Sequence, residues 1–258
     1  MKEKDALGNR MKLYEQEEAG RKLNHFLPII ARIDGRCFSN FTAGLERPFD
    51  LGMSTLMVEV TKELVREFNC DIGYTQSDEI TLVWIPDLDN MERQMVFGGK
   101  VAKLNSVLAS STTMWFHNMK AKYLPTSHLE KKATFDCRVW NVPSKIEAAN
   151  CLVWREIDCM KNSISMAAMN YFSHKLLIGK TGKEKKALLL EVGVDWDKYP
   201  EFFKRGTYVQ KRCINYTVDN IDYTRREVYI LDIPMLKDVK NKSEVLFDQS
   251  KPIFKEPV

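Results

Sequence analysis

The chain of 258 residues lacks several features that would assign it to a common functional class. Its six cysteines form no CxxC pair and no histidine stands beside them at ligand spacing, which argues against a zinc site. No apolar stretch approaches the length of about 18 residues that a membrane helix needs, and the N-terminus has no apolar signal segment. We therefore expect a cytoplasmic protein with free thiols and no membrane partner.

A phosphate-binding loop is also missing. Gly179-Lys180-Thr181 matches the end of that motif, but His174 stands where its first glycine is required, and no strand pattern precedes it. Net charge is small, because 39 Lys and Arg oppose 35 Asp and Glu and leave +4. Basic residues nevertheless cluster in the second half of the chain, at 131–132, 180–186, 204–205, 211–212 and 225–226. Such clusters fit either a polyanionic partner such as RNA or an ordinary solvated surface.

Hydrophobic periodicity predicts an α+β fold. Apolar and β-branched runs predict strands over 26–33, 72–75, 80–85 and 135–142, and helical spacing predicts helices over 53–68 and 91–116. The order βαββαβ is that of ferredoxin-like antiparallel sheets, which polymerase palms and nucleotide cyclases share. We expect the helices of this palm-like core to pack on one face of the sheet.

The segments outside this core are expected to extend it. The charged residues 1–23 predict a helix docked along one edge. A third helix over 144–178 should direct Trp154 and Met169 inward, and a late strand pair should end in a hairpin arm over 227–233. Since the sequence has no repeat and no low-complexity linker, we expect a single domain over 1–258, with a core over 24–143 and an RNA-binding extension over 144–258.

Two short acidic clusters carry the strongest chemical signal. Asp34 follows the first predicted strand, and Asp78 lies in the turn between the second and third. If the strands that carry them are neighbours, the two carboxylates converge and could hold divalent cations against a polyphosphate, as in two-metal nucleotidyl transfer. Gly35 permits a sharp turn and could add its carbonyl oxygen as a ligand. The alternative is two unrelated aspartates in surface turns.

Residues around these clusters could contact a nucleotide. Glu79 could be a further cation ligand or could orient one. Backbone N–H groups and short side chains at Arg36, Phe38 and Ser39 could face a triphosphate, and Ser77 could donate a hydrogen bond from the other side. Phe38 could equally well pack in the core.

Lysines and one strand pair add weaker candidates. Lys100 and Lys103 lie three residues apart on a predicted helix and could neutralise a triphosphate, or could belong to a solvated helix face. Asp136 and Arg138 alternate on the fourth strand and could pair with each other or orient a substrate.

Taken together, these residues resemble the tRNA(His) guanylyltransferase superfamily, whose members add nucleotides in the 3′ to 5′ direction. The resemblance rests on RIDGRCFSNFT (32–42), RPFD (47–50), YTQSDEI (74–80), FDCR (135–138), WREID (154–158) and FKRGT (203–207). It implies two Mg²⁺ ions on Asp34, the Gly35 carbonyl and Asp78, with ATP and GTP or another nucleoside triphosphate as substrates. It also implies the following nucleotide contacts: Asp34, Gly35, Arg36, Cys37, Phe38, Ser39, Arg47, Asp50, Ser77, Asp78, Lys100 and Lys103.

One segment departs from the eukaryotic members of that superfamily. They carry HINNLYN after an Asp-Cys pair, whereas this chain has DCMKNSISM at 158–166 and keeps only Asn162. The segment looks like the bacterial, archaeal and organellar branch, which favours templated repair of 5′-truncated tRNAs. We therefore expect a repair polymerase that first adenylylates the RNA 5′ end with ATP.

Three other activities remain as alternatives. They are a tRNA(His) guanylyltransferase that adds an extra 5′ guanosine, a tRNA-binding protein that has lost catalysis, and a nucleotide cyclase on the same sheet. The resemblance also implies a homo-tetramer. RNA contacts are expected from six basic residues: Arg138, Arg155, Lys204, Arg205, Lys211 and Arg212.

Overall fold

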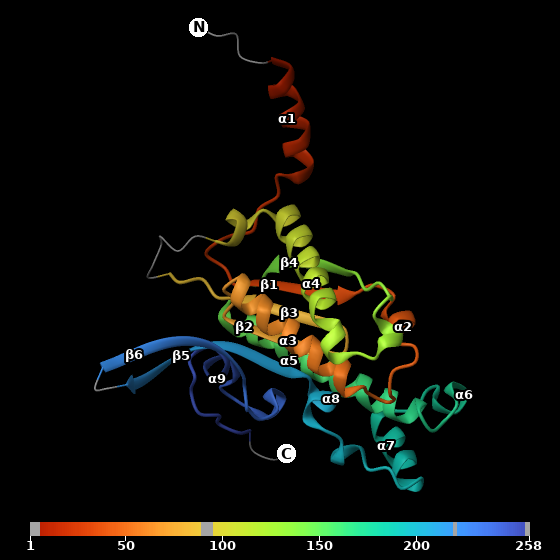
Figure 1. Ribbon diagram of the computed structural model, residues 1–258. Helices are drawn as coiled ribbons and strands as arrows, with labels where there is room; N and C mark the ends of the chain where they lie inside the picture. Colours follow the sequence, from red (N-terminus) through yellow and green to blue (C-terminus); the bar gives the residue numbers. More distant parts are fainter. Residues whose placement is uncertain (1–5, 89–94, 219–220, 256–258) are drawn as a thin grey trace.

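The computed structural model describes residues 6–88, 95–218 and 221–255, without the side chains of residues 214 and 215. Its centre is a six-stranded antiparallel sheet with the strand order β4-β1-β3-β2-β5-β6 (Figure 1). The strands are β1 Ile29–Gly35, β2 Ile72–Gln76, β3 Glu79–Trp84, β4 Phe135–Asn141, β5 Thr207–Val218 and β6 Ile221–Ile230. The predicted α+β fold is confirmed, and β1 and β3 are neighbours, as the argument from Asp34 and Asp78 required.

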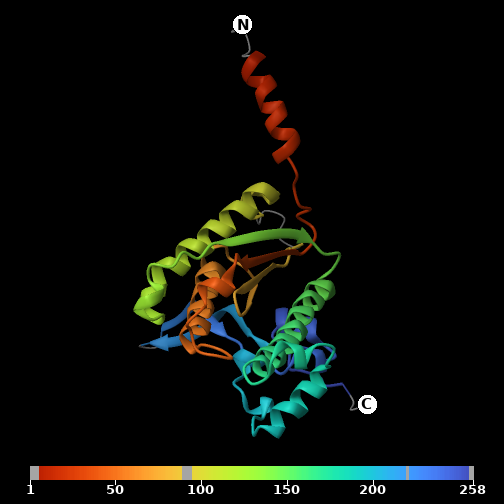
Figure 2. The same ribbon diagram turned by 90° about the vertical axis from the view of Figure 1, so that its right-hand side faces the viewer.

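The helices cover both faces of this sheet. Alternate residues of β1, such as Ile29, Ala31 and Ile33, face α3 (Leu51–Glu67) and α4 (Val101–Tyr123), the two helices of the βαββαβ core. Ile30, which alternates with them, packs on the opposite face with residues of α5 (Lys145–Met169) and of the C-terminal segments. Figure 2 shows α5 and α4 on different sides of the sheet. Because both faces are covered, β2 and β3 are buried along their whole length.

Caps define where the long helices begin. The Asp50 carboxylate accepts a hydrogen bond from the Met53 N–H at 2.8 Å and starts α3, and the Ser144 hydroxyl accepts one from Glu147 N–H at 3.2 Å and starts α5. The remaining helices are short or peripheral: α1 Ala6–Ala19, α2 Phe38–Phe41, α6 His174–Leu177, α7 Gly182–Glu191, α8 Glu201–Arg205 and α9 Lys242–Phe247.

The second core helix starts later than predicted. Residues 89–94 lie outside the described part of the chain, and α4 begins only at Val101. Phe97, Gly98 and Gly99 have φ values of 51°, 58° and 70°, in the left-handed region, so a continuous right-handed helix cannot pass through them. Lys100 is therefore the N-cap residue of α4 and does not lie on its face.

Two expectations for the helices outside the predicted core were wrong. No residue of α1 is buried, and the helix projects from the body instead of docking along an edge (Figure 1). Helix α5 ends at Met169, and Trp154 and Met169 are each 50% exposed instead of facing inward. Small residues such as Ala148 and Ala149 form the buried stripe of α5, while the Trp154 ring stacks near the guanidinium groups of Arg32 and Arg155.

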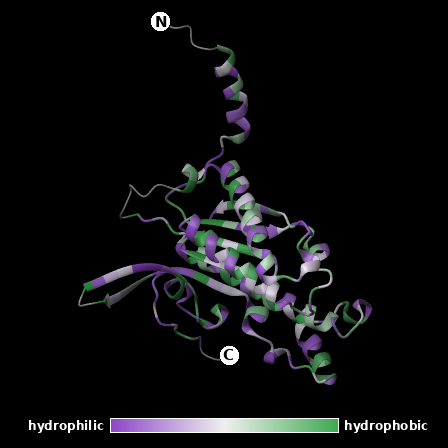
Figure 3. Ribbon diagram, in the orientation of Figure 1, coloured by the Kyte–Doolittle hydropathy of each residue, from purple (hydrophilic) through white to green (hydrophobic). Residues whose placement is uncertain are grey.

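The late strand pair is longer than expected. Only residues 207–209 of β5 pair with β2, whereas the ladder with β6 runs from Val209 opposite Ile230 to Val218 opposite Ile221. The outer part of this hairpin therefore extends beyond the main sheet as a two-stranded arm (Figure 1). Figure 3 shows that hydrophobic residues concentrate in the central strands, while α1 mixes both kinds. None of the helices in the described ranges has the length and apolar character needed to cross a membrane.

Candidate active site

The two acidic clusters meet at one end of the sheet. Asp34 on β1 lies directly opposite Glu79 on β3 in the strand register. The next residue, Gly35, donates its N–H to the backbone oxygen of Asp78 at 3.2 Å. Both aspartates line the same cavity. The structure thus brings together the residues that the sequence placed at separate strand ends.

Local backbone geometry explains why this turn needs glycine and serine. A Cβ atom added at Gly35 would lie 2.7 Å from Oδ2 of Asp78 and would also overlap the Phe38 ring. Ser77 has a φ of 50°, and its hydroxyl donates to Oδ1 of Asp78 at 3.1 Å. The missing side chain at Gly35 and the Ser77 hydrogen bond together leave the Asp78 carboxylate in one defined position beside β1.

The environment of these carboxylates favours a bound cation. Burial raises the pKa of Asp78, and the nearby charge of Asp34 raises it further, against backbone and Ser77 hydrogen bonds that lower it. Two carboxylates and the carbonyl of Gly35 offer hard oxygen donors of the kind that Mg²⁺ prefers. In the described ranges no three His, Cys, Asp or Glu residues are grouped as metal ligands, so a cation here would rely on two carboxylates plus backbone and substrate oxygens.

Glu79 is held by a buried arginine. Arg155 on α5 donates to both carboxylate oxygens of Glu79, from Nε to Oε1 and from Nη2 to Oε2, each at 2.6 Å. The same Nη2 reaches Oδ2 of Asp158 at 2.9 Å. Both oxygens of Glu79 are engaged, which favours the orienting role over the ligand role. The Arg155 side chain is only 9% exposed in this pair, which leaves little surface for its expected contact with RNA.

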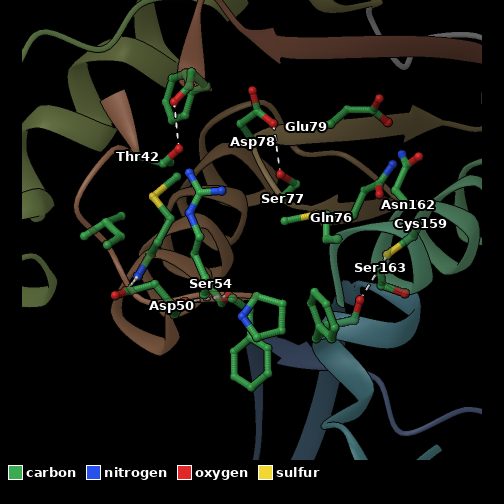
Figure 4. Close-up of a pocket in the computed structure, with 18 of the residues that line it drawn as sticks. Thr42, Asp50, Ser54, Gln76, Ser77, Asp78, Glu79, Cys159, Asn162 and Ser163 are labelled. Carbon is green, nitrogen blue, oxygen red and sulfur yellow. Dashed lines mark hydrogen bonds between the residues drawn. The ribbon is translucent and has the colours of Figure 1, made fainter. Parts of the chain in front are cut away.

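The cavity beside the carboxylates has a volume of about 580 Å³, within the usual range for small-molecule sites. Figure 4 shows the β2–β3 turn with Ser77, Asp78 and Glu79 on one side, Asp50 and Ser54 on a second, and residues of α5 on a third. Away from the carboxylates the lining is largely apolar, with Met53, Phe49, Met166, Met169 and Phe202. One end of the cavity therefore suits phosphate with its cations, and the rest suits a flat organic group.

The segment after Asp34 contributes backbone and small side chains. Cys37 is exposed with a φ of 54°, and Ser39 is exposed at the cavity. Arg36 is exposed and donates its N–H to the Thr134 carbonyl at 2.9 Å, although its side chain does not line the cavity. The Phe38 ring is buried in an aromatic cluster with Phe41, Phe116 and Phe135, so core packing, the alternative weighed for it, accounts for its position.

Arg47 and Asp50 lie on the cavity wall, but they differ in what they can do. Arg47 is exposed there and can face an anion. Asp50 accepts hydrogen bonds from the N–H groups of Met53 at 2.8 Å and Glu46 at 3.3 Å, one on each carboxylate oxygen. Asp50 therefore closes the loop before α3 and shapes the wall, while its negative charge disfavours direct contact with a triphosphate.

The structure does not bring Lys100 and Lys103 to this cavity, so within one chain it gives no support to their predicted contact with the triphosphate, which stays a prediction. Lys100 pairs with Lys22 in an isolated bridge, and the Lys103 ammonium lies 5.1 Å from the centre of the Phe97 ring. Phe97 contacts Phe68, which accepts a hydrogen bond from Trp84 at the end of β3 farthest from Glu79. Because α4 begins there, both lysines lie at the opposite end of the sheet from Asp34.

The other predicted RNA contacts separate into buried and exposed residues. Arg205 is 8% exposed and pairs with Glu156 at 3.2 Å, which leaves little surface for the expected contact with RNA. Lys204 is largely enclosed and donates to the Asp197 carbonyl at 2.8 Å. Arg138 is exposed beside Asp136 at 3.4 Å, and Lys211 and Arg212 line a separate groove of about 820 Å³. These last three remain available to a polyanion.

Sequence reasoning missed the cavity wall that α5 supplies. Asn162, Met166 and Met169 line the cavity, together with Cys159, Ser163 and Asn170. Their spacing of three and four residues places them on one face of a helix. The available signal in the sequence was a second face of the predicted helix, beside the alanine stripe, on which polar side chains and methionines recur at helical spacing.

Comparisons with known proteins agree with one another. Residues 8–143 match the model of the tRNAHis guanylyltransferase family. An uncharacterized protein of Acanthamoeba polyphaga mimivirus is 31% identical over 243 residues, which cover 84% of this chain and 80% of the viral protein. A solved bacterial tRNA(His) guanylyltransferase-like protein in complex with ATP superposes with a TM-score of 0.80 and 32% identity over 94% of this chain and 99% of its own. The corresponding GTP complex gives a TM-score of 0.76 and 31% identity over 94% and 98%.

Proposed function

Since the chain belongs to the tRNAHis guanylyltransferase family, whose members are nucleotidyltransferases, we propose that it extends the 5′ end of tRNA in the 3′ to 5′ direction. The proposed task is repair of 5′-truncated tRNA by addition of nucleotides that pair with the template strand. The observation that carries the proposal is the convergence of Asp34 and Asp78 at the mouth of a cavity of nucleotide size.

The site residues fit divalent cations. Asp34, the Gly35 carbonyl and Asp78 would hold two Mg²⁺ ions, and the overlap that any side chain at position 35 would make with Asp78 supports a close approach at this point. Bound Mg²⁺ would neutralise phosphate charge and lower the pKa of an attacking hydroxyl. Ser77 would keep the Asp78 carboxylate oriented through its hydrogen bond.

The proposed chemistry has two nucleotidyl-transfer steps. In the first, an oxygen of the RNA 5′ monophosphate attacks the α-phosphorus of ATP, and pyrophosphate leaves. In the second, the 3′ hydroxyl of a template-paired nucleoside triphosphate attacks the activated 5′ phosphate, and AMP leaves. The apolar cavity wall would hold the base, and Arg47 would face the triphosphate. The ATP and GTP complexes of the bacterial relatives support nucleotides as substrates.

The α5 wall supports repair over addition of an extra guanosine. Ser163, Ser165 and Met166 are positions where this chain departs from the eukaryotic pattern, and all three line the cavity. The bacterial relative with bound ATP also matches nearly the whole chain. The proposed RNA contacts are the exposed Arg138 and the half-buried Lys211 and Arg212, with the core and the C-terminal extension acting as one domain.

A primer-extension assay tests this assignment. Purified protein is given a tRNA that lacks its first 5′ nucleotide, with ATP and each nucleoside triphosphate separately. Repair predicts addition only of the nucleotide complementary to the template position. Guanosine added regardless of the template would favour the tRNA(His) reaction, and no addition of any nucleotide would overturn both.

We also propose that the working form is a homo-tetramer. The exposed apolar residues Leu7, Met11 and Tyr14 of α1 and the stacked Tyr216 and Tyr223 of the hairpin arm support contacts with other copies. Sedimentation of the purified chain at several concentrations measures this directly, and a monomer at micromolar concentration would contradict it.

A further inference from the structure

The ion pair between Glu79 and Arg155 is unusual for its position beside the carboxylates of the site. Both side chains are about one-tenth exposed, and both oxygens of Glu79 are bound by the guanidinium fork at 2.6 Å. A planar guanidinium can make this two-point contact, whereas an ammonium cannot. The fork therefore determines which way the Glu79 carboxylate points.

Glu79 would otherwise be a competitor for the cation site. It lies directly opposite Asp34 in the register of β1 and β3, and opposed residues of an antiparallel pair project from the same face about 5 Å apart. It also follows Asp78 in the chain and lines the same cavity. A Glu79 side chain without a partner could swing its carboxylate toward Asp34.

Arg155 also ties Glu79 to the opposite wall of the cavity. Its Nη2 contacts Asp158 at 2.9 Å, and Asp158 accepts a hydrogen bond from the Asn162 amide at 3.2 Å. Asn162 lines the cavity. A chain of contacts thus runs from β3 through Arg155 to the part of α5 that lines the cavity.

We propose that Arg155 is a positioning residue that holds Glu79 against α5, so that only Asp34 and Asp78 present carboxylates to the cations. This inference rests on the proposed function, since it assumes that the two aspartates bind divalent cations. It goes beyond that function in naming Arg155 as the residue that keeps Glu79 out of the ligand set.

The test measures binding of Mn²⁺, as a probe for Mg²⁺, to the full chain without nucleotide or RNA. Arg155→Lys keeps the positive charge and removes the fork. Release of Glu79 should add a third carboxylate, so this variant should bind Mn²⁺ about tenfold more tightly than the native chain. Adding Glu79→Gln to Arg155→Lys should return the affinity to within about twofold of the native value.

Kinetics provide a second readout of the same variant. Misplaced cations should lower kcat about tenfold while the KM for ATP changes less than about threefold, because the apolar wall that holds the base is unchanged. Arg205→Lys is the matched control: it makes the same replacement in the neighbouring buried pair with Glu156 and should leave Mn²⁺ affinity unchanged.

Two outcomes would overturn different claims. If Arg155→Lys binds Mn²⁺ as the native chain does, or if Arg205→Lys raises the affinity equally, Arg155 has only a structural role and the inference is wrong. If the Asp34→Asn variant binds Mn²⁺ as tightly as the native chain does, the proposed cation site is wrong and the inference fails with it.

Discussion

The same strands finish very differently at their two ends. At one end, β1 and the β2–β3 turn bring Asp34 and Asp78 together beside a cavity. At the other end, Ile29 lies opposite Trp84, which packs near Phe68 and donates its indole N–H to the Phe68 carbonyl at 3.0 Å. We call these the carboxylate end and the tryptophan end.

The difference lies in what the side chains contribute. At the carboxylate end, burial raises the pKa of Asp78 and of Glu79. Buried carboxylates of this kind cost folding stability and are typical of functional sites. At the tryptophan end, aromatic rings are packed and hydrogen-bonded, which stabilises the fold. Substitutions at the two ends should therefore separate activity from stability.

The largest effect is expected from Asp78→Ala. Loss of a carboxylate that would hold the cations should reduce both nucleotidyl-transfer steps by about 10³-fold or more. The melting temperature at neutral pH should not fall, because burial of the ionised Asp78 carboxylate is unfavourable. Extension assays and thermal unfolding of the same preparation measure the two quantities.

Asp71→Ala supplies the matched control at the tryptophan end. Asp71 precedes β2 and accepts a hydrogen bond from the Ile85 N–H at 2.6 Å, so this variant should lose stability and keep activity. The pH dependence of the free energy of unfolding should also differ between Asp78→Ala and the native chain. Because the folded-state pKa of Asp78 is raised, the native chain loses stability as pH rises through that pKa, and Asp78→Ala should lack this loss. Equal loss of activity in both variants would remove the distinction between the ends.

Gly35→Ala should have the next largest effect. Its methyl group would lie 2.7 Å from Oδ2 of Asp78 and overlap the Phe38 ring, so the carboxylate or β1 must move. A displacement of about 1 Å should lower the rate about 100-fold, and we expect some loss of stability as well. Steady-state kinetics should show the loss mainly in kcat, and native kcat in this variant would mean that the carboxylates need not approach so closely.

Much of the carboxylate end could be predicted because its signals are local. The predicted strands over 26–33 and 80–85 adjoin the two acidic clusters, and an antiparallel pairing of those strands is enough to bring the clusters together. The βαββαβ order follows from the same patterns. Asp50 was named as a possible nucleotide contact, and in the structure its carboxylate caps α3 and closes the loop before that helix.

The rest depended on contacts between distant segments. Arg155 and Glu79 are 76 residues apart in the sequence. Before α5 is known to pack on the sheet, an arginine in this motif is most simply interpreted as a surface charge. The start of α4 is different, because the left-handed backbone at residues 97–99 has a local signal, the Gly98-Gly99 pair, which the predicted helix over 91–116 ran through. That shift moved Lys100 and Lys103 to the tryptophan end. Trp154, for its part, stacks with arginines instead of packing inward.

Trp84→Phe probes the tryptophan end directly. It removes the hydrogen bond to the Phe68 carbonyl and leaves space among Phe68 and its neighbours, which should lower the free energy of unfolding by about 1–2 kcal/mol. Nucleotide addition should stay within about twofold of the native rate when measured well below the melting temperature. Chemical denaturation gives the stability, and a large drop in kcat would show that the two ends are coupled.

The smallest effect is expected from Lys103→Ala, which tests the corrected position of this lysine. Lys103 is exposed, contacts the Phe97 ring and lies away from the cavity, so the variant should keep its KM for ATP and its kcat within about twofold. Arg47→Ala, on the cavity wall, is the matched loss of one positive charge and should raise the KM for ATP about tenfold. If Lys103→Ala raises the KM as much as Arg47→Ala, the lysine must reach the nucleotide of another copy of the chain. The two ends of the sheet would then form one site across the proposed tetramer, and comparing the two variants at protein concentrations where the chain is a monomer and where it is assembled would distinguish these cases.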